Sequence, residues 1–357
     1  MEKIWFAEYQ KTGIPETVAL PAENTSLVDI FESNFQKFGS RDAFIFMDKA
    51  MSFNELELAS RKFATYLQNL GLAKGTRVAV MMPNVLQYPV VALAVLRAGL
   101  VLVNVNPLYT ARELEHQLND SGSEVLVIIE NFASVYQSIL GKTPVKHVVV
   151  ATVGDMLGTL KGTLVNFVLR KVRKQIPAWN IPGYVKFNTA LNKVSPSNYK
   201  RPNLTLSDTA VLQYTGGTTG VSKGAELTHL NLVANLLQCD GIFQSKFGAN
   251  DGAKGDRIVC ALPLYHIFAF MVCAMYGMYK GQANILIPNP RDLPAVINEL
   301  RKYLPHAYVY MQAIVITLKN YDYSYYCYCY DFFLIWPVGN LALLCFKVAP
   351  QIAEIIY

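Results

Sequence analysis

The run RVAVMMPNVLQYPVVALAVLRAGLVLVNVNP, residues 77–107, decides the fold class. It predicts a strand, a buried helix that ends at Gly99, and a second strand rich in β-branched residues. A further helix (residues 110–122) and strand (residues 123–130) follow in the same order. Apolar strands that alternate with helices are typical of parallel βαβ units covered on both faces. Because such crossovers are right-handed, the sequence predicts an α/β fold with doubly wound sheets.

The chain before this run shows a similar alternation. Residues 27–38 have apolar residues at helical spacing, and Asp29 is placed to help cap the first turn. Residues 42–48 predict a strand. Residues 52–72 predict a helix that begins at a serine cap and ends near Gly71. These elements extend the predicted α/β domain toward the N-terminus.

Length and composition limit the classes of protein. At 357 residues, the chain is long enough for two or three domains. A net charge of +6 favours small anionic partners, such as nucleotides, phospholipid headgroups or acyl carboxylates, over nucleic acid. The six cysteines show no metal-binding spacing, which indicates reduced thiols. The N-terminus lacks a signal-peptide pattern and no run of about 20 apolar residues occurs, so we expect a cytoplasmic chain without a membrane span.

The stretch YTGGTTGVSKG, residues 214–224, follows an apolar strand and carries the clearest functional signal. Glycines allow the backbone to approach a phosphate chain closely, and consecutive loop N–H groups can hold anionic oxygens. The threonine hydroxyls can donate hydrogen bonds or ligate Mg²⁺, and Lys223 adds a positive charge. Two residues separate this lysine from the preceding glycine, so the loop is not the common P-loop. The pattern predicts a phosphate-binding loop of another type, with a flexible surface turn as the alternative.

Three histidines are candidates for function. In LPLYHIFAF, residues 262–270, His266 stands in an apolar run, where a packed core residue is statistically more common than a functional one. His116 has a glutamate one helical turn away, but no third ligand is apparent, so we expect an exposed helix face and not a metal site. His229, after the glycine-rich loop, is predicted to serve packing or capping.

A basic amphipathic segment occupies residues 157–179. One interpretation is a helix that lies on an anionic membrane surface or beside an acyl-chain entrance. The other is an ordinary surface helix with a solvated basic face. Its cations are Lys161, Arg170, Lys171, Arg173 and Lys174.

Three motifs carry a resemblance to a known family. YTGGTTGVSKGAELTH is similar to the signature loop of the acyl-adenylate-forming enzymes. Together with NVNPLYTARELEHQLNDSG and LPLYHIFAF, it resembles bacterial long-chain fatty-acid–CoA ligases. The resemblance covers residues 25–304 and implies the N-terminal AMP-binding (adenylation) domain of that family. It also implies a two-step reaction, in which a fatty carboxylate and ATP form an acyl adenylate and diphosphate, and CoA then displaces AMP.

The resemblance also implies site residues. ATP, with Mg²⁺, and CoA as co-substrate are the expected ligands. An acyl pocket is expected to be lined by Tyr265, His266 and Phe268, and Mg²⁺ to be held by Thr215 and Thr218. The phosphates of ATP are expected to be held by Tyr214, Thr215, Gly216, Gly217, Thr218, Thr219, Gly220, Val221, Ser222, Lys223 and Gly224.

Other motifs of the family do not occur in this sequence. They are a glycine-tyrosine-glycine motif for adenine and Mg²⁺, an aspartate for the ribose, and a small C-terminal domain with the adenylation lysine. We therefore assign no catalytic residue, and we expect a partial adenylation domain over residues 1–304 that is incomplete at its C-terminus. Residues 305–357 form a tyrosine-rich stretch unlike the family. This stretch is typical of a frameshift or truncation product, with a membrane-associating tail and a divergent core segment as alternatives.

The function predicted on this basis is that of a long-chain fatty-acid–CoA ligase, with weak or no activity in this chain. One alternative is a non-catalytic protein that binds acyl chains or nucleotide. Another is an adenylating ligase for a different carboxylic acid. The expected partners are small molecules, together with a peripheral contact to the inner face of the membrane through Lys161 to Lys174. The resemblance further implies a homodimer for the full-length family.

Overall fold

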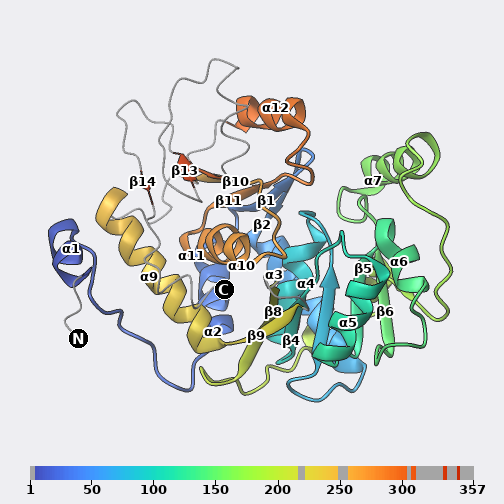
Figure 1. Cartoon of the computed structure of the whole chain (residues 1–357), viewed down its shortest axis with the longest axis horizontal. Coiled ribbons are helices and arrows are strands. Elements are labelled where there is room, and N and C mark those ends of the chain that lie inside the picture. The colour runs from blue at the N-terminus through green and yellow to red at the C-terminus, as the bar shows by residue number, and fades with distance from the viewer. Residues whose placement is uncertain are drawn as a thin grey trace.

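The computed structural model describes residues 5–215, 222–247, 256–303, 307–310, 333–335 and 344–345. Within these ranges, the chain builds two seven-stranded sheets with helices between and outside them (Figure 1). The first sheet has the strand order β14-β13-β12-β10-β11-β1-β2. The second has the order β7-β6-β5-β3-β4-β8-β9.

The second sheet contains the run that decided the fold class. Its parallel strands are β3 (Arg77–Met81), β4 (Val101–Asn104), β5 (Val125–Ile129), β6 (His147–Ala151), β7 (Val185–Lys186) and β8 (Thr209–Thr215). An antiparallel strand, β9 (Lys223–Thr228), closes the edge beside β8. The helices α4 (Gln87–Arg97) and α5 (Ala111–Ser121) connect β3 to β4 and β4 to β5. The predicted βαβ units are therefore confirmed.

The first sheet joins the beginning of the chain to residues more than 200 positions later. The strands β1 (Asp42–Phe46), β10 (Arg257–Cys260), β11 (Ala283–Leu286) and β12 (Ala307–Tyr310) run parallel. The strands β2 (Lys49–Ser52), β13 (Phe333–Ile335) and β14 (Leu344–Cys345) pair antiparallel to their neighbours. The predicted tail, residues 305–357, lies mostly outside the described residues, so its separate nature stays a prediction.

Helices form three layers around the two sheets (Figure 1). The inner layer contains α2 (Leu27–Phe38), α3 (Phe53–Asn69), α4, α9 (His229–Phe247) and the π-helical η4 (Phe270–Met275). Outside the second sheet lie α5 and α6 (Ala133–Gln137), and outside the first lies α12 (Leu293–Tyr303). The remaining elements are α1 (Trp5–Thr12), η1 (Glu130–Phe132), α7 (Thr159–Phe167), η2 (Val168–Val172), α8 (Phe187–Asn192), η3 (Pro196–Asn198), α10 (Ile267–Ala269) and α11 (Tyr276–Lys280).

Local signals explain where the early helices begin and end. The Ser52 N–H donates to the Glu55 carboxylate at 2.7 Å, and the Glu55 N–H donates to the Ser52 hydroxyl, which makes a capping box at the start of α3. The Ser26 N–H donates to Asp29 at 2.8 Å at the start of α2. Gly71 follows α3 with a φ of +73°, a conformation that glycine adopts without strain. The predicted caps are confirmed.

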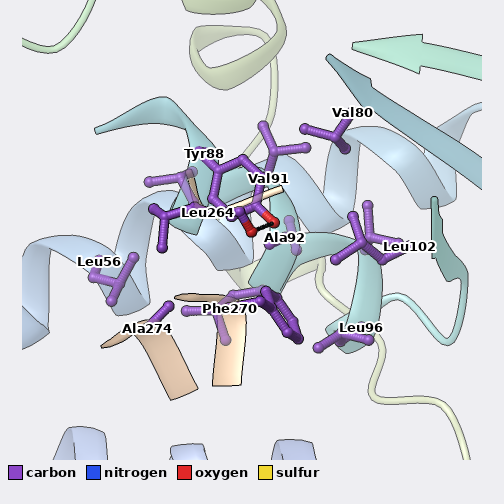
Figure 2. Packing of buried hydrophobic residues seen from close by; sticks show 14 of the residues in the cluster. Leu56, Val80, Tyr88, Val91, Ala92, Leu96, Leu102, Leu264, Phe270 and Ala274 are labelled. Carbon is purple, nitrogen blue, oxygen red and sulfur yellow. Dashed lines mark hydrogen bonds between the residues drawn. The ribbon is translucent and has the colours of Figure 1, made fainter. Parts of the chain in front are cut away.

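The core between the two sheets is continuous. Residues of β3 and β4 contact the inner helices on one side, and residues of β1 and β10 contact them on the other. Figure 2 shows part of this cluster, in which Tyr88 and Phe270 are fully buried. Burying one such aromatic ring contributes about 2–3 kcal/mol. This core fixes the two sheets relative to each other, and with them the two segments that carry the predicted site.

Candidate functional site

The two predicted motifs follow the carboxyl ends of strands from different sheets. The stretch 214–224 forms the end of β8, the loop and the start of β9. The stretch 262–270 follows β10 of the first sheet. Ligands of open α/β sheets bind outside the carboxyl ends of the strands, so both motifs lie where such a site is expected. Residues 216–221 of the loop fall outside the described residues.

Asn84 fixes the second motif to the second sheet. It follows β3 and is 2% exposed. Its side-chain amide donates to the carbonyl oxygens of Cys260 (3.0 Å) and Leu262 (2.9 Å), and its Oδ1 accepts from the Leu264 N–H at 2.8 Å. The backbone after β10 is therefore held by one buried side chain from the other sheet.

A chain of buried polar groups then reaches the glycine-rich loop. The Tyr88 hydroxyl on α4 lies 2.8 Å from the Leu264 carbonyl oxygen (Figure 2) and 2.7 Å from Asn104 Oδ1. Asn104, at the end of β4, donates to Gln213 Oε1 at 3.1 Å. Gln213 donates in turn to the Tyr265 carbonyl oxygen at 3.1 Å. Since Gln213 directly precedes Tyr214, the two motifs meet at this point.

The ends of the loop are closely packed. The Tyr214 side chain is buried, and its hydroxyl donates to Asp120 Oδ2 on α5 at 2.5 Å. Burial, together with the hydrogen bond to Asp120, raises the pKa of Tyr214, so the hydroxyl keeps its proton. The Ser222 hydroxyl donates to the Thr215 carbonyl oxygen at 3.0 Å and closes the hairpin. Gly224 lies against the Tyr214 ring, where a Cβ atom would approach the ring carbons to 2.8 Å.

Lys223 is the cation next to the loop. It pairs with Thr215 in the β8–β9 register, and its side chain is exposed. Within the described part of the chain, Lys223 makes no ion pair. Thr218, the second predicted Mg²⁺ ligand, lies outside the described residues, as do Gly216, Gly217, Thr219, Gly220 and Val221.

His266 caps a short helix and keeps one ring nitrogen for other partners. Its Nδ1 accepts from the Phe268 N–H at 3.3 Å, so the neutral ring carries its proton on Nε2. Partial removal of water lowers the pKa of His266 below its usual value, so the ring is neutral near pH 7. The side chain is exposed, whereas Tyr265 and Phe268 are half-buried. His266 can therefore act as a neutral hydrogen-bond donor, and its place in an acyl pocket stays a prediction.

The other two histidines have different outcomes. The prediction that His116 lies on an exposed helix face is wrong, because the hairpin folds against α5 and places Ser222 O 3.0 Å from His116 Nε2. His229 is buried, and its Nδ1 accepts from the Leu27 N–H at 3.3 Å, which confirms packing and capping. Burial lowers the pKa of His229 to about 4. Among the described residues, no group of three His, Cys, Asp or Glu side chains could hold a metal ion.

The basic segment forms α7 and η2, and only some of its cations contact the protein. Arg170 in η2 pairs with the buried Glu130 at 2.6 Å, and Lys161 in α7 donates to the Met47 carbonyl oxygen. These two cations therefore contact the protein, whereas Lys171, Arg173 and Lys174 are exposed, so the solvated basic face that was one interpretation holds for only part of the segment. Exposed apolar side chains occupy the outer side, namely Leu160 (89%), Leu164 (62%), Phe167 (56%) and Val172 (65%). Among the helices that the structure describes, none is both long and apolar enough to cross a bilayer.

A pocket of about 600 Å³ lies at the other end of the second sheet, where its parallel strands begin. It is lined at the amino ends of the strands by residues of both charges, among them Lys74, Arg77 and Glu226. It faces away from both motifs, and mixed charges do not favour an anionic ligand. The candidate site that we consider is therefore the one formed by the two motifs after β8 and β10.

Comparison with known proteins connects this geometry to a family. A sequence model described as "AMP-binding enzyme" matches residues 31–330. The chain belongs to the AMP-binding enzyme family. It is 47% identical over 304 residues to a long-chain-fatty-acid–CoA ligase of Escherichia coli O157:H7. That alignment covers 85% of this chain and 53% of that relative. It is 32% identical to the Bacillus subtilis ligase of the same name, over 80% of this chain and 50% of that relative. The chain thus spans about half the length of the curated relatives it matches.

Solved structures show the same fold for this AMP-binding chain. A long-chain-fatty-acid–CoA ligase from Archaeoglobus fulgidus aligns with a TM-score of 0.64 and 25% identity, over 81% of this chain and 52% of that one. The anthranilate CoA ligase AuaEII, solved with anthranoyl-AMP, aligns with a TM-score of 0.65 over 80% of this chain and 49% of that one. At 20% identity, the second comparison supports the fold alone. The doubly wound sheets expected of an adenylation domain are confirmed.

Proposed function

We propose that this chain provides the ATP-phosphate and acyl-binding parts of a long-chain fatty-acid–CoA ligase. Such an enzyme converts ATP, a fatty acid and CoA into acyl-CoA, AMP and diphosphate through an acyl adenylate. The observation that carries the proposal is the Gln213–Tyr265 hydrogen bond, which joins the glycine-rich hairpin to the His266 segment. The names of the relatives support the choice of a long-chain fatty acid as the substrate.

The hairpin is proposed to hold the β- and γ-phosphates of ATP. Backbone N–H groups of a glycine-rich turn can surround phosphate oxygens, and the exposed Lys223 adds a mobile charge. The buried Tyr214 serves as an anchor of this loop, because its hydroxyl is already bonded to Asp120. The loop would therefore place the α-phosphate toward the His266 segment for attack by the fatty carboxylate. Since the carboxylate is already a nucleophile, positioning and charge neutralisation are the main contributions required of these residues.

Mg²⁺ is proposed to accompany ATP at the same loop. In nucleotide sites Mg²⁺ keeps several waters and binds phosphate oxygens with only one or two protein ligands. A threonine hydroxyl is a suitable oxygen ligand, and Thr215 stands at the end of β8 where the loop begins. Thr215 and Thr218 would thus hold the ion, which would neutralise phosphate charge.

The segment after β10 is proposed to form the acyl-binding wall. Tyr265 and Phe268 are half-buried and offer apolar surface, and the exposed His266 offers a neutral N–H. A neutral donor can orient a carboxylate or phosphate oxygen without removing a proton from it. CoA would enter as the second substrate after the acyl adenylate has formed.

ATP affinity tests this proposal most simply. We expect calorimetry of the 357-residue chain to show that Lys223→Ala weakens ATP binding by tenfold or more, because a charged contact to phosphate is lost. AMP binding should change little, since AMP lacks the β- and γ-phosphates. The matched control is Lys193→Ala, which removes an exposed lysine elsewhere. Equal ATP affinity of the parent and Lys223→Ala would contradict the proposed role of the loop.

Two alternatives remain for the activity. A non-catalytic binding protein would bind a fatty acid saturably without turnover. A ligase for another acid would show fatty-acid-dependent ATP–diphosphate exchange with a different chain-length profile. Exchange that requires a long-chain acid and vanishes in Lys223→Ala supports the first proposal over both.

A peripheral membrane contact is a second proposal, carried by the outer side of α7 and η2. Figure 1 shows α7 at the margin of the molecule, away from the inner helices. Its exposed apolar side chains can enter the headgroup region of a lipid surface. The exposed Lys171, Arg173 and Lys174 would complement anionic headgroups.

Vesicle sedimentation tests the membrane contact. The chain should sediment with phosphatidylglycerol vesicles and less with phosphatidylcholine vesicles. Leu164→Ser with Phe167→Ser should reduce this binding severalfold, whereas Leu58→Ser, at an exposed position on α3, should not. Unchanged binding of the double variant would exclude this surface. Sedimentation velocity without lipid tests the homodimer that the resemblance implies.

A further inference from the structure

The helix α5 contacts the glycine-rich hairpin on both sides of its loop. His116 Nε2 lies 3.0 Å from the Ser222 carbonyl oxygen, directly after the loop. Four residues further along the helix, the Asp120 carboxylate accepts a hydrogen bond from the Tyr214 hydroxyl at 2.5 Å. Tyr214 lies at the other end of the loop, shortly before its first residue. Residues four apart share one face of a helix, so one surface of α5 reaches both ends of the hairpin loop.

α5 is itself firmly fixed to the second sheet. Thr110 and Glu113 form a capping box at its start, where the Thr110 N–H donates to Glu113 at 2.8 Å. The buried Gln117 donates to the Asn104 carbonyl oxygen at 2.8 Å and ties the helix to the end of β4. Leu114 and Leu118 are fully buried against the outer face of the sheet. Any residue that bonds to α5 is therefore held in a fixed position relative to the carboxyl ends of the strands.

The contacts also decide where two carbonyl oxygens point. An anion-binding loop must present N–H groups to its ligand and keep carbonyl oxygens away from it. The two carbonyl oxygens at the ends of this loop, Thr215 O and Ser222 O, both accept hydrogen bonds within the protein. The Ser222 hydroxyl holds the first and His116 the second. Because a carbonyl oxygen cannot donate, His116 must carry a proton on Nε2 in this contact.

We propose that His116 and Asp120 are positioning residues, which hold the two ends of the glycine-rich hairpin, at Ser222 and Tyr214, from the outer face of the sheet. His116 turns the Ser222 carbonyl oxygen toward α5, and Asp120 holds the Tyr214 side chain over Gly224. Neither side chain needs to touch the nucleotide. The identity of the ligand rests on the function proposed above, but the placement of the hairpin does not.

Hydrogen exchange of the nucleotide-free chain tests the placement. Amide exchange in residues 209–215 and 222–228 should become faster in His116→Ala and in Asp120→Ala. His116→Gln should restore slow exchange, because the glutamine amide can donate from near the position of Nε2. Arg112→Ala, at an exposed position of the same helix, is the matched control. Unchanged exchange in His116→Ala, or no rescue by glutamine, overturns the proposal.

Nucleotide affinity then tests the consequence. The net value of one such hydrogen bond corresponds to a roughly three- to tenfold loss of ATP affinity in His116→Ala. AMP affinity should stay the same, and His116→Gln should recover most of the ATP affinity. A general loss of folding would instead weaken both nucleotides and would not be rescued, which overturns the positioning role. If the parent chain fails to bind ATP, the proposed function fails, and hydrogen exchange still decides the role of α5.

Discussion

His229 makes the stability of the chain depend on pH in a way that can be worked out. His229 is the first residue of α9, and it is 2% exposed. Its Nδ1 accepts a hydrogen bond from the Leu27 N–H at the start of α2. Burial lowers its pKa to about 4, although Asp208 and Asp29 oppose this shift, and Lys74 adds to it. In the unfolded chain, the same ring titrates at its ordinary pKa of about 6.5.

The sign follows from proton counting. Between about pH 6.5 and about pH 4, the unfolded chain binds a proton at His229 that the folded chain does not. The free energy of unfolding therefore falls as the pH falls through this window, and the contribution is constant above it. At about 1.4 kcal/mol per pH unit, the full window corresponds to about 3 kcal/mol.

The variant His229→Asn isolates this effect. An asparagine oxygen can accept the Leu27 N–H from near the position of Nδ1, and it does not titrate. Urea unfolding followed by circular dichroism at pH 7.0 and pH 4.5 gives the free energy of unfolding of both proteins. At pH 7.0 the parent should be the more stable by about 1–2 kcal/mol, because the ring packs better. At pH 4.5 the difference should shift by about 2–3 kcal/mol in favour of the variant.

The other carboxylates and histidines are shared by both proteins, so their titration cancels in this difference. A difference between parent and variant that stays constant from pH 7.0 to pH 4.5 would refute the reasoning. It would mean that His229 accepts a proton in the folded chain at its ordinary pKa.

Three substitutions test other parts of the structure. Arg97→Ala removes a buried cation 2.9 Å from Glu57, so urea unfolding should show a loss of about 3–5 kcal/mol, and a loss below about 1 kcal/mol would contradict the pairing. Tyr88→Phe removes the hydroxyl that bonds to the buried Leu264 carbonyl oxygen, so the free energy of unfolding should fall by about 1–3 kcal/mol in the same assay. An unchanged free energy of unfolding would mean that this contact is weak. Gly224→Ala places a Cβ about 2.8 Å from ring carbons, so it should lower both the melting temperature and ATP affinity, and a neutral result would contradict the close packing.

The second sheet and the helix caps could be predicted because their signals are local. The apolar run 77–107 carries strand and helix in direct succession, and Ser52, Asp29 and Gly71 mark helix ends within one turn. The first sheet could not be predicted in the same way. Its strand β1 pairs with β11, more than 230 residues later, and short apolar strands do not specify a partner at that distance.

The glycine-rich motif was enough to propose the candidate site, but the side chains that join its two segments could not be predicted. Asn84, Tyr88, Asn104 and Gln213 connect the two motifs. Asn104 begins one of the motifs that carry the resemblance, but no pattern in the sequence assigned any of the four this connecting role. A signal was present, since Asn104 and Gln213 are polar residues within otherwise apolar strands. Buried polar residues need partners, and such positions at the ends of parallel strands could have been marked as candidates.

The orientation of the basic segment shows another limit. Helical spacing separated a basic side from an apolar side, but it did not decide which side faces the protein. The buried Glu130 decides it, because an unpaired carboxylate there would be costly, and Arg170 supplies the pair. The partner of Glu130 stands 40 residues later, so the sequence alone gave no reason to connect them.

The central claim is that the β8–β9 hairpin binds the phosphates of ATP. The most direct measurement is amide hydrogen exchange of the 357-residue chain with Mg²⁺ and either ATP or AMP. The account predicts that ATP slows exchange in residues 209–228 and that AMP does so much less, because only ATP carries the β- and γ-phosphates. Protection that is equal with both nucleotides, or that lies outside these residues, would contradict it.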